Sequence, residues 1–250
     1  MHIEGNTVLV TGGASGIGFA LAQRFARAGS TVVVCGRRKE QLEEAKRLCP
    51  ELHTIPCDLS SETERVALVE RVTRAFPALN VLVNNAGIQN RPPRWTEAQD
   101  WASYRAEIAI NIEAPVHLSM LLTRHLIAQA SASILNVTSG LAFVPIAFMP
   151  MYCATKAAVH SFTLSLRYQL QGTSVRVVEV IPPAVETDLG GKGLHTTGVP
   201  VDAFADHAME QLEKGELEFG YQFSEKARLA TRDEQAGIFT TMNARFPQPR

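Results

Sequence analysis

Three glycines between a short apolar run and an amphipathic stretch constrain the fold of this chain most. Residues 7–10 have the composition of a buried strand, Gly12, Gly16 and Gly18 follow closely, and a helical pattern then continues to Gly29. The first glycine permits a tight turn, while the later two let a ligand approach the backbone and let the helix pack on a sheet. Backbone N–H groups and the helix dipole favour a pyrophosphate at such a turn. A merely flexible turn would explain one glycine but not three.

Strands and helices alternate along most of the chain. We expect strands at 31–35, 52–56, 80–83, 133–137, 174–181 and 218–223, and helices at 39–49, 62–76, 101–130, 152–170 and 202–214. This alternation predicts an α/β fold: a single doubly wound Rossmann domain, with a parallel sheet of about seven strands and helices on both faces. The 250 residues, 46% of them hydrophobic, suit one domain over 1–250.

The pattern weakens after residue 181. Pro182 and Pro183 end the strand, and glycines at 190, 191, 193 and 198 frame a stretch with little periodicity. A loop this long in a compact domain is usually functional or mobile. We therefore expect a substrate lid over roughly 186–215.

Composition and charge exclude several classes of function. The net charge is −1 and acidic and basic residues are interspersed, so the chain lacks the electrostatic footprint of nucleic-acid binding or of an acidic membrane surface. No stretch approaches the ~18 apolar residues of a membrane helix, and the N-terminus lacks the pattern of a signal peptide. The four cysteines show no C-x-x-C spacing and the seven histidines form no metal-binding pattern. We expect a cytoplasmic protein with reduced thiols and no metal site.

The end of the second strand indicates which nicotinamide dinucleotide would bind. A carboxylate there would bond a ribose 2′-hydroxyl, whereas an arginine accommodates a 2′-phosphate. The strand ends in Cys35, Gly36, Arg37 and Arg38, with no acid. A guanidinium grips a phosphate with paired hydrogen bonds, so we predict NADP(H) in preference to NADH, with Arg37 as the main contact and Arg38 as a second. The alternative is two solvated arginines at a helix start.

Tyr152 and Lys156 are spaced one helical turn apart. Residues four apart lie on the same helix face, so a phenol and an ammonium meet there. A free tyrosine has a pKa of about 10, and a fixed positive charge nearby lowers that value. The pair could therefore act as an acid/base near neutral pH. The alternative is a half-buried tyrosine beside an ordinary surface lysine.

Three further features extend this pattern. Asn84-Asn85-Ala86-Gly87 follows the fourth expected strand, Ser139 ends the fifth, and Asn111 lies inside the long helix. With these motifs in this order, the chain strongly resembles the short-chain dehydrogenase/reductase family, in the branch with a Thr-Gly-x-x-x-Gly-x-Gly turn. The resemblance covers residues 7–189. The amino-acid sequences of 139–143 and 152–162 are similar to those of the bacterial DltE-like subgroup.

The resemblance implies catalytic roles for four residues in the interconversion of a carbonyl and a secondary alcohol. Tyr152 would be the acid/base at the substrate oxygen, and Ser139 would hydrogen-bond the same oxygen. Lys156 would lower the pKa of Tyr152 and hold the nicotinamide ribose. Asn111 would kink its helix and position a water that continues the proton path.

The resemblance also implies a set of cofactor contacts. Asp58 would contact the adenine amine through its side chain and Leu59 through its backbone, while Val185 and Thr187 would hold the nicotinamide carboxamide. The family usually has glycine where this chain has Pro183, and proline removes a backbone N–H. The full expected set is Gly12, Ser15, Gly16, Ile17, Gly18, Arg37, Arg38, Asp58, Leu59, Asn84, Ala86, Gly87, Tyr152, Lys156, Pro182, Val185 and Thr187.

Residues expected to line the substrate cleft are apolar, which suggests a substrate with a hydrophobic body: Leu141, Phe143, Phe148, Met149, Leu189 and Leu194. Arg91, Arg94 and Arg105 could instead recruit an anion, although such arginines are more often solvated or at a subunit contact. By resemblance we expect a homodimer or homotetramer. Two other functions stay open: a regulatory module that binds NADPH without turnover and, less favoured by its glycine spacing, a sugar-nucleotide epimerase.

Overall fold

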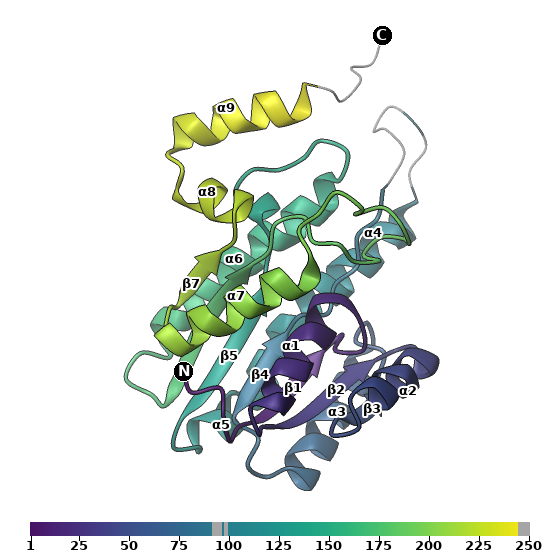
Figure 1. The fold of residues 1–250 in the computed structure, drawn as a ribbon, viewed down its shortest axis with the longest axis vertical. Helices are drawn as coiled ribbons and strands as arrows, with labels where there is room; N and C mark the ends of the chain where they lie inside the picture. The colour runs from purple at the N-terminus through teal and green to yellow at the C-terminus, as the bar shows by residue number, and fades with distance from the viewer. Residues whose placement is uncertain (92–96, 98–99, 245–250) are drawn as a thin grey trace.

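A parallel sheet forms the centre of the computed structural model, which describes residues 1–91, 97 and 100–244 (Figure 1). Seven strands pair in the order β3-β2-β1-β4-β5-β6-β7. The order reverses between β1 and β4, which is where open α/β sheets bind ligands. This confirms the predicted doubly wound fold. The strands are β1 (Thr7–Thr11), β2 (Thr31–Gly36), β3 (His53–Pro56), β4 (Val81–Asn84), β5 (Ala132–Val137), β6 (Val175–Ile181) and β7 (Glu218–Gly220).

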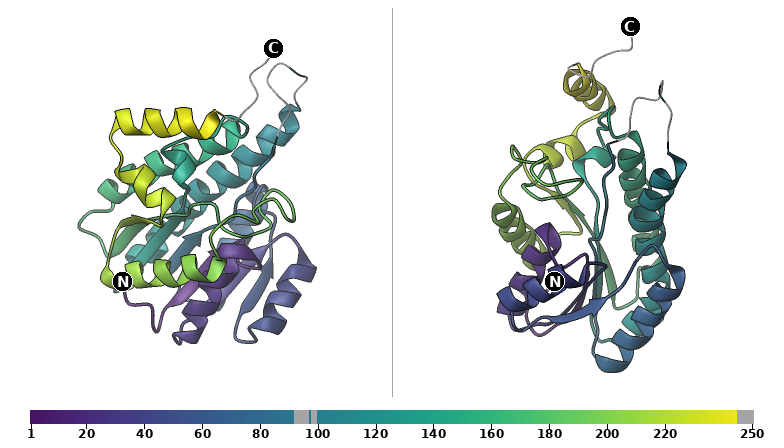
Figure 2. Two further views of the ribbon diagram at one scale, coloured as in Figure 1. Left: turned by 45° about the horizontal axis from the view of Figure 1, so that its top comes forward. Right: turned by 90° about the vertical axis from the view of Figure 1, so that its right-hand side faces the viewer.

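Helices cover both faces of the sheet (Figure 2). Strand residues alternate between two cores, so that Val8 and Val10 face one layer of helices and Leu9 faces the other. Among the described helices, none combines the length and hydrophobicity that crossing a bilayer requires. One layer holds α1 (Gly16–Arg27), α2 (Lys39–Leu48) and α7 (Val201–Lys214), and the other holds α3 (Glu62–Ala75), α5 (Ala114–Ile127) and α6 (Pro150–Gln169).

The long helix expected over 101–130 is interrupted, which corrects that prediction. α4 (Trp101–Ile108) passes into a π-helical segment, η1 (Ala109–Glu113), before α5 begins. Pro115 has no N–H, so the Asn111 carbonyl loses the donor that a regular helix would supply. Single π-helical turns occur frequently at functional sites, and this one contains Asn111.

The α7 part of the expected lid belongs to the core. Phe204, Ala205 and Ala208 are fully buried against α1, and Arg24 of α1 pairs with Asp206 at 2.7 Å. Burial of this apolar face fixes the helix. Only the segment before α7 has the irregular backbone that the lid prediction assumed.

The C-terminal part of the chain departs from the sequence prediction. The last strand ends at Gly220 and not at 223, because Gln222 takes a positive φ of 51° and Phe223 begins a helix. Two helices not predicted from the sequence follow, α8 (Phe223–Leu229) and α9 (Arg232–Asn243). They lie together above the carboxyl end of the sheet (Figure 1). A short 3-10 turn, η2 (Gly140–Ala142), follows β5 beneath them.

Candidate active site

The glycine turn connects β1 to the first turn of α1. Gly12 and Gly16 adopt positive φ values of 62° and 54°, which side chains other than glycine rarely tolerate. Ser15 is the N-cap residue of α1, but its side chain accepts no hydrogen bond from the N–H groups of the first turn. This turn also contains no acidic residue. The helix start therefore keeps its N–H groups and positive dipole end for an anion.

The turn is held against the segment after β4 by contacts that leave no room for a side chain. A Cβ at Gly12 would lie 2.9 Å from Ala86 Cα, and one at Gly18 would overlap with the Asn85 amide. Asn85 Nδ2 donates to the Thr11 carbonyl at 2.9 Å. The geometry fits a dinucleotide whose pyrophosphate lies over the turn.

Thr11 and Asn85 were missed as functional residues from the sequence. The Thr11 hydroxyl accepts hydrogen bonds from the Asn85 and Ala86 N–H groups, at 2.9 and 3.0 Å, and donates to Val83 O. Together they fasten the glycine turn to β4. The signal was their position beside Gly12 and Asn84 in the two motifs.

The residues expected at the adenosine end lie at the ends of β2 and β3. Arg37 and Arg38 are exposed, and Arg38 is the N-cap residue of α2. Burial acts to raise the pKa of Asp58, but hydrogen bonds from Ser60 and the charge of Arg37 outweigh it and hold the pKa below its usual range. The carbonyl of Leu59 accepts a hydrogen bond from Arg65 at 2.7 Å.

The Asn84 side chain points away from the glycine turn. It is buried on the α5 side of the sheet, where its Nδ2 donates to Asn136 Oδ1 at 2.9 Å and to Ser119 Oγ at 3.2 Å. Any contact of Asn84 with a cofactor would therefore have to come from its backbone.

Tyr152, Ser139 and Lys156 come together at the carboxyl end of β5. All three side chains are buried, and a hydrogen bond links the phenol to Ser139. The Lys156 ammonium donates to the carbonyl of Val137 at 2.9 Å and lies 5.8 Å from the centre of the Tyr152 ring. A Cβ at Gly87 would be 3.6 Å from Lys156 Nζ, so the segment after β4 borders the same site.

The protonation of this pair differs from the sequence expectation. Burial raises the pKa of Tyr152 above its ordinary value, with a smaller raising effect from Cys153 that the Ser139 hydrogen bond opposes. Burial also lowers the pKa of Lys156 to about 8. The expected lowering of the phenol pKa by the ammonium is thus not found, because desolvation dominates both groups.

Asn111 binds the backbone beside the site. Its side-chain amide exchanges two hydrogen bonds with Ile88, each 2.9 Å long, and also donates to Thr155 Oγ1 at 3.1 Å. The segment after Gly87 is therefore tied to η1 and to α6 at once.

Glu107 was missed from the sequence. It lies one turn before Asn111, is 1% exposed, and accepts a hydrogen bond from the Asn90 N–H at 2.8 Å. Burial raises its pKa, and its charge acts to raise the pKa of Tyr152. Its spacing of four from Asn111 was the available signal.

The loop after β6 returns to the glycine turn despite Pro183. The carbonyl of Pro182 accepts a hydrogen bond from Gly140 N at 2.9 Å, and Val185 pairs with Val199. A Cβ at Gly16 would lie 3.2 Å from the Thr187 methyl group. Thr187 is thus brought beside the start of α1, as the expected cofactor contacts require.

The residues expected to contact substrate are only partly available. Leu141 lies on η2 and Phe143 directly follows it, and both are half-buried. Met149 is 4% exposed and belongs to the interior. Arg91 lies over the Phe148 ring at 5.5 Å. The segment containing Leu194 reaches the region after β4 through a contact of 3.2 Å between His195 and Gln89.

Two of the arginines named as possible anion ligands are described, and they have different surroundings. Arg105 is exposed on α4, whereas Arg91 stacks on Phe148 and acts, after burial, to lower the pKa of His195. Arg94 lies outside the described residues.

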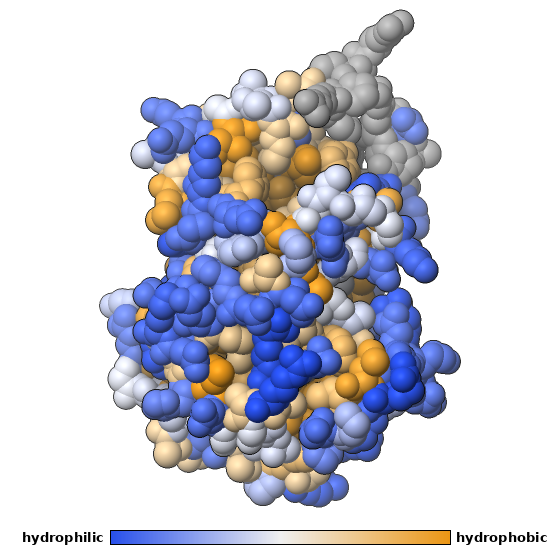
Figure 3. Space-filling view, viewed as in Figure 1, coloured by the Kyte–Doolittle hydropathy of each residue, from blue (hydrophilic) through white to orange (hydrophobic). Residues whose placement is uncertain are grey.

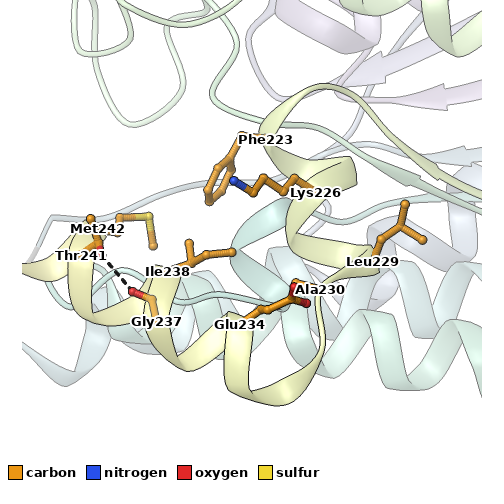
Figure 4. Close-up of a pocket in the computed structure, with 9 residues that line it drawn as sticks. All are labelled: Phe223, Lys226, Leu229, Ala230, Glu234, Gly237, Ile238, Thr241 and Met242. Carbon is orange, nitrogen blue, oxygen red and sulfur yellow. Dashed lines mark hydrogen bonds between the residues drawn. The ribbon is translucent and has the colours of Figure 1, made fainter.

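A hollow of about 850 Å³ lies between α8 and α9 and contains none of the expected catalytic residues (Figure 4). Apolar residues gather on this part of the surface in Figure 3. Phe223, which lines the hollow, also approaches the position of Gly140, and Asn243 of α9 accepts a hydrogen bond from Ala147 N at 2.6 Å. The two C-terminal helices therefore buttress the loop that follows Ser139.

Comparison with known proteins agrees with this geometry. A family model described as short chain dehydrogenase matches residues 6–197. The chain is 44% identical over 248 residues to an uncharacterized oxidoreductase, DltE, of Bacillus subtilis, covering 97% of this chain and 98% of that protein.

Solved structures are similar over much or all of the chain. One is a short chain dehydrogenase from Burkholderia cenocepacia in complex with NADP, which is 28% identical with a TM-score of 0.82 and is covered completely in both chains. Another is a 3-ketoacyl-(acyl-carrier-protein) reductase from Brucella melitensis complexed with NADH, 28% identical with a TM-score of 0.77 over 84% of this chain and 91% of that one.

Proposed function

Because the chain belongs to the short-chain dehydrogenase family of oxidoreductases, and within it to the DltE-like subgroup, we propose that it interconverts a carbonyl and a secondary alcohol with NADP(H). The observation that supports this most is the meeting of Ser139, Tyr152 and Lys156 beside the glycine turn. A proton donor and a dinucleotide-binding turn at the same edge of a sheet are what carbonyl reduction requires.

The chain's own groups would handle the proton. Tyr152 is protonated at neutral pH. The phenol would donate this proton to a carbonyl oxygen, and the nearby Lys156 ammonium would favour the phenolate that remains. Ser139 would hydrogen-bond that oxygen as negative charge develops on it. Lys156, with a pKa of about 8, carries a proton that it can return to the phenol by way of hydroxyl groups or water.

The nicotinamide cofactor, when bound, would supply or accept the hydride. The N-terminus of α1 would bind its pyrophosphate, and Lys156 would hold its ribose. Arg37 would contact the 2′-phosphate, because it is exposed at the end of β2 and no carboxylate occupies that strand end. Structural relatives with NADP and with NADH are both known, so this preference rests on Arg37.

The cofactor preference predicts a clear response to Arg37→Asp. Loss of the guanidinium and repulsion by the new carboxylate should weaken NADPH binding by at least about ten-fold, while NADH binding stays the same or improves. Dissociation constants of both cofactors, from fluorescence titration, measure this. Arg38→Asp, at the second predicted contact, should weaken NADPH binding less than Arg37→Asp. If Arg37→Asp binds NADPH as tightly as wild type, Arg37 does not contact the 2′-phosphate.

The cysteines suit a reducing compartment. Cys35, Cys49, Cys57 and Cys153 are all free and buried, and burial raises the pKa of each thiol. Buried thiols of this kind are inert and keep their reduced form in the cytoplasm, which is where we place the enzyme.

A panel of carbonyl compounds tests the proposed activity. NADPH absorbance is followed with aliphatic, aromatic and acidic ketones and aldehydes, since the half-buried residues near Ser139 are apolar. Consumption of NADPH with formation of the alcohol is the expected result. Tight NADPH binding without turnover on any member would favour instead a regulatory NADPH-binding protein.

A further inference from the structure

Glu179 is a carboxylate enclosed in the interior beside the proposed site. It lies in β6 and is fully buried, and both of its oxygens are paired. Thr138 Oγ1 donates to Oε1 at 2.6 Å, and His160 Nδ1 lies 2.8 Å from Oε2. A buried charge is costly even when it is paired, and an apolar residue would avoid that cost. The network therefore calls for a role other than filling the core.

The two ends of this network lie next to residues of the proposed site. Thr138 directly precedes Ser139 at the end of β5. His160 follows Lys156 by four residues and Tyr152 by eight, so the three side chains share one face of α6. Glu179 consequently connects the strand end that carries Ser139 to the helix that carries the other two.

His160 also contacts Phe143. The two ring centres are 4.6 Å apart and the rings are inclined by 59°. The hydrogen bond to Glu179 raises the pKa of His160, and an imidazolium is attracted to an aromatic face. Other charged groups near His160 are Glu218 of β7, which favours its protonation, and Arg167 of α6, which opposes it, while Arg228 of α8 pairs with Glu218 at 3.6 Å.

We propose that Thr138, Glu179 and His160 form a positioning unit that holds the Ser139 turn and Phe143 in place against the helix carrying Tyr152 and Lys156. The proposal rests on the proposed function for its effect on turnover. None of the three residues would touch the reacting atoms; they act through Ser139 and Phe143.

The first test needs no substrate. Glu179→Gln keeps the size of the side chain and removes its charge, and His160→Gln provides a second variant in case the first fails to fold. Glu210→Gln is the control, because it also removes the charge of a paired carboxylate, but Glu210 pairs with Lys214 within α7 at 2.6 Å. Hydrogen exchange is measured at the amides of 140–144, which bond within η2 and to Pro182.

We expect exchange at these amides to accelerate by at least about ten-fold in Glu179→Gln and in His160→Gln, and to stay unchanged in the control. The second test measures carbonyl reduction. NADPH affinity should stay within about two-fold of wild type in all variants, while kcat/KM falls by about ten-fold or more in the two network variants. The double variant should lose no more than either single one, because both break the same connection.

The pH dependence separates positioning from a general loss of structure. The wild-type KM for the carbonyl should rise as pH increases through the His160 pKa determined by NMR, and His160→Gln should show no such rise. Network variants that exchange and turn over like Glu210→Gln would overturn the proposal. If wild type reduces no carbonyl, the proposed function fails, and the exchange comparison alone then decides whether the unit holds the turn.

Discussion

At the scale of single residues, the site is governed by desolvation. Lys156 and Tyr152 are both buried, and in each case burial favours the neutral form. The sequence places the two groups one turn apart but carries no information on how much water reaches them. The direction of the Tyr152 pKa shift was therefore predicted wrongly, although the residues themselves were found.

The lowered pKa of Lys156 predicts that Lys156→Met changes the pH dependence of the free energy of unfolding. The pKa of Lys156 is about 8 in the folded chain and about 10.5 when unfolded, so between these values the unfolded chain binds more protons. The stability of wild type relative to the variant should therefore rise with pH through this window, by up to ~1.4 kcal/mol per pH unit. Urea unfolding at several values from pH 7 to pH 10 measures the difference. A difference that does not vary with pH would show that Lys156 is not desolvated.

At the scale of elements, regular segments were predictable where the local pattern determines them. The strands before residue 182 and most helices follow from apolar periodicity and from glycine and proline positions. Of the π-helical segment, the resemblance implied a kink at Asn111, but periodicity alone predicted one unbroken helix. The start of α8 was not predictable, because buried Ser224 donates to Ile181 O at 2.6 Å, a contact between segments far apart in sequence.

The packing of α7 predicts that Phe204→Ala strongly destabilises the chain. Phe204 is fully buried between α7 and α1, and truncating such a ring costs about 3–5 kcal/mol. Phe239→Ala is the control, since Phe239 on α9 is 40% exposed and should lose far less. Chemical denaturation of both variants measures the costs. Equal and small losses would mean that α7 belongs to a mobile lid after all.

At the scale of the whole molecule, two helices of one layer, α5 and α6, leave large apolar side chains exposed. Met120 and Ile127 of α5 and Leu164 and Tyr168 of α6 are between 42% and 74% exposed. The two helices lie in the same layer, and large exposed patches of this kind often mark contacts between subunits (Figure 2). We therefore propose that the expected homo-oligomer forms through α5 and α6.

Leu164→Asp should shift this oligomer towards the monomer. A carboxylate in an apolar contact would be desolvated without a partner, which costs several kcal/mol. Leu229→Asp, on exposed α8, is the control and should leave the assembly unchanged. Light scattering coupled to size exclusion gives the molar mass of each variant. The assignment fails if both variants keep the wild-type mass.

The Tyr152 hydroxyl is the central group of the proposed function, as the proton donor beside a bound dinucleotide. The most direct measurement is the turnover of Tyr152→Phe on a carbonyl that wild type reduces, together with its NADPH dissociation constant. The substitution keeps the buried ring, so NADPH affinity should stay within about two-fold while turnover falls by ~10²-fold or more. Turnover near that of wild type, with NADPH bound equally well, would contradict the account.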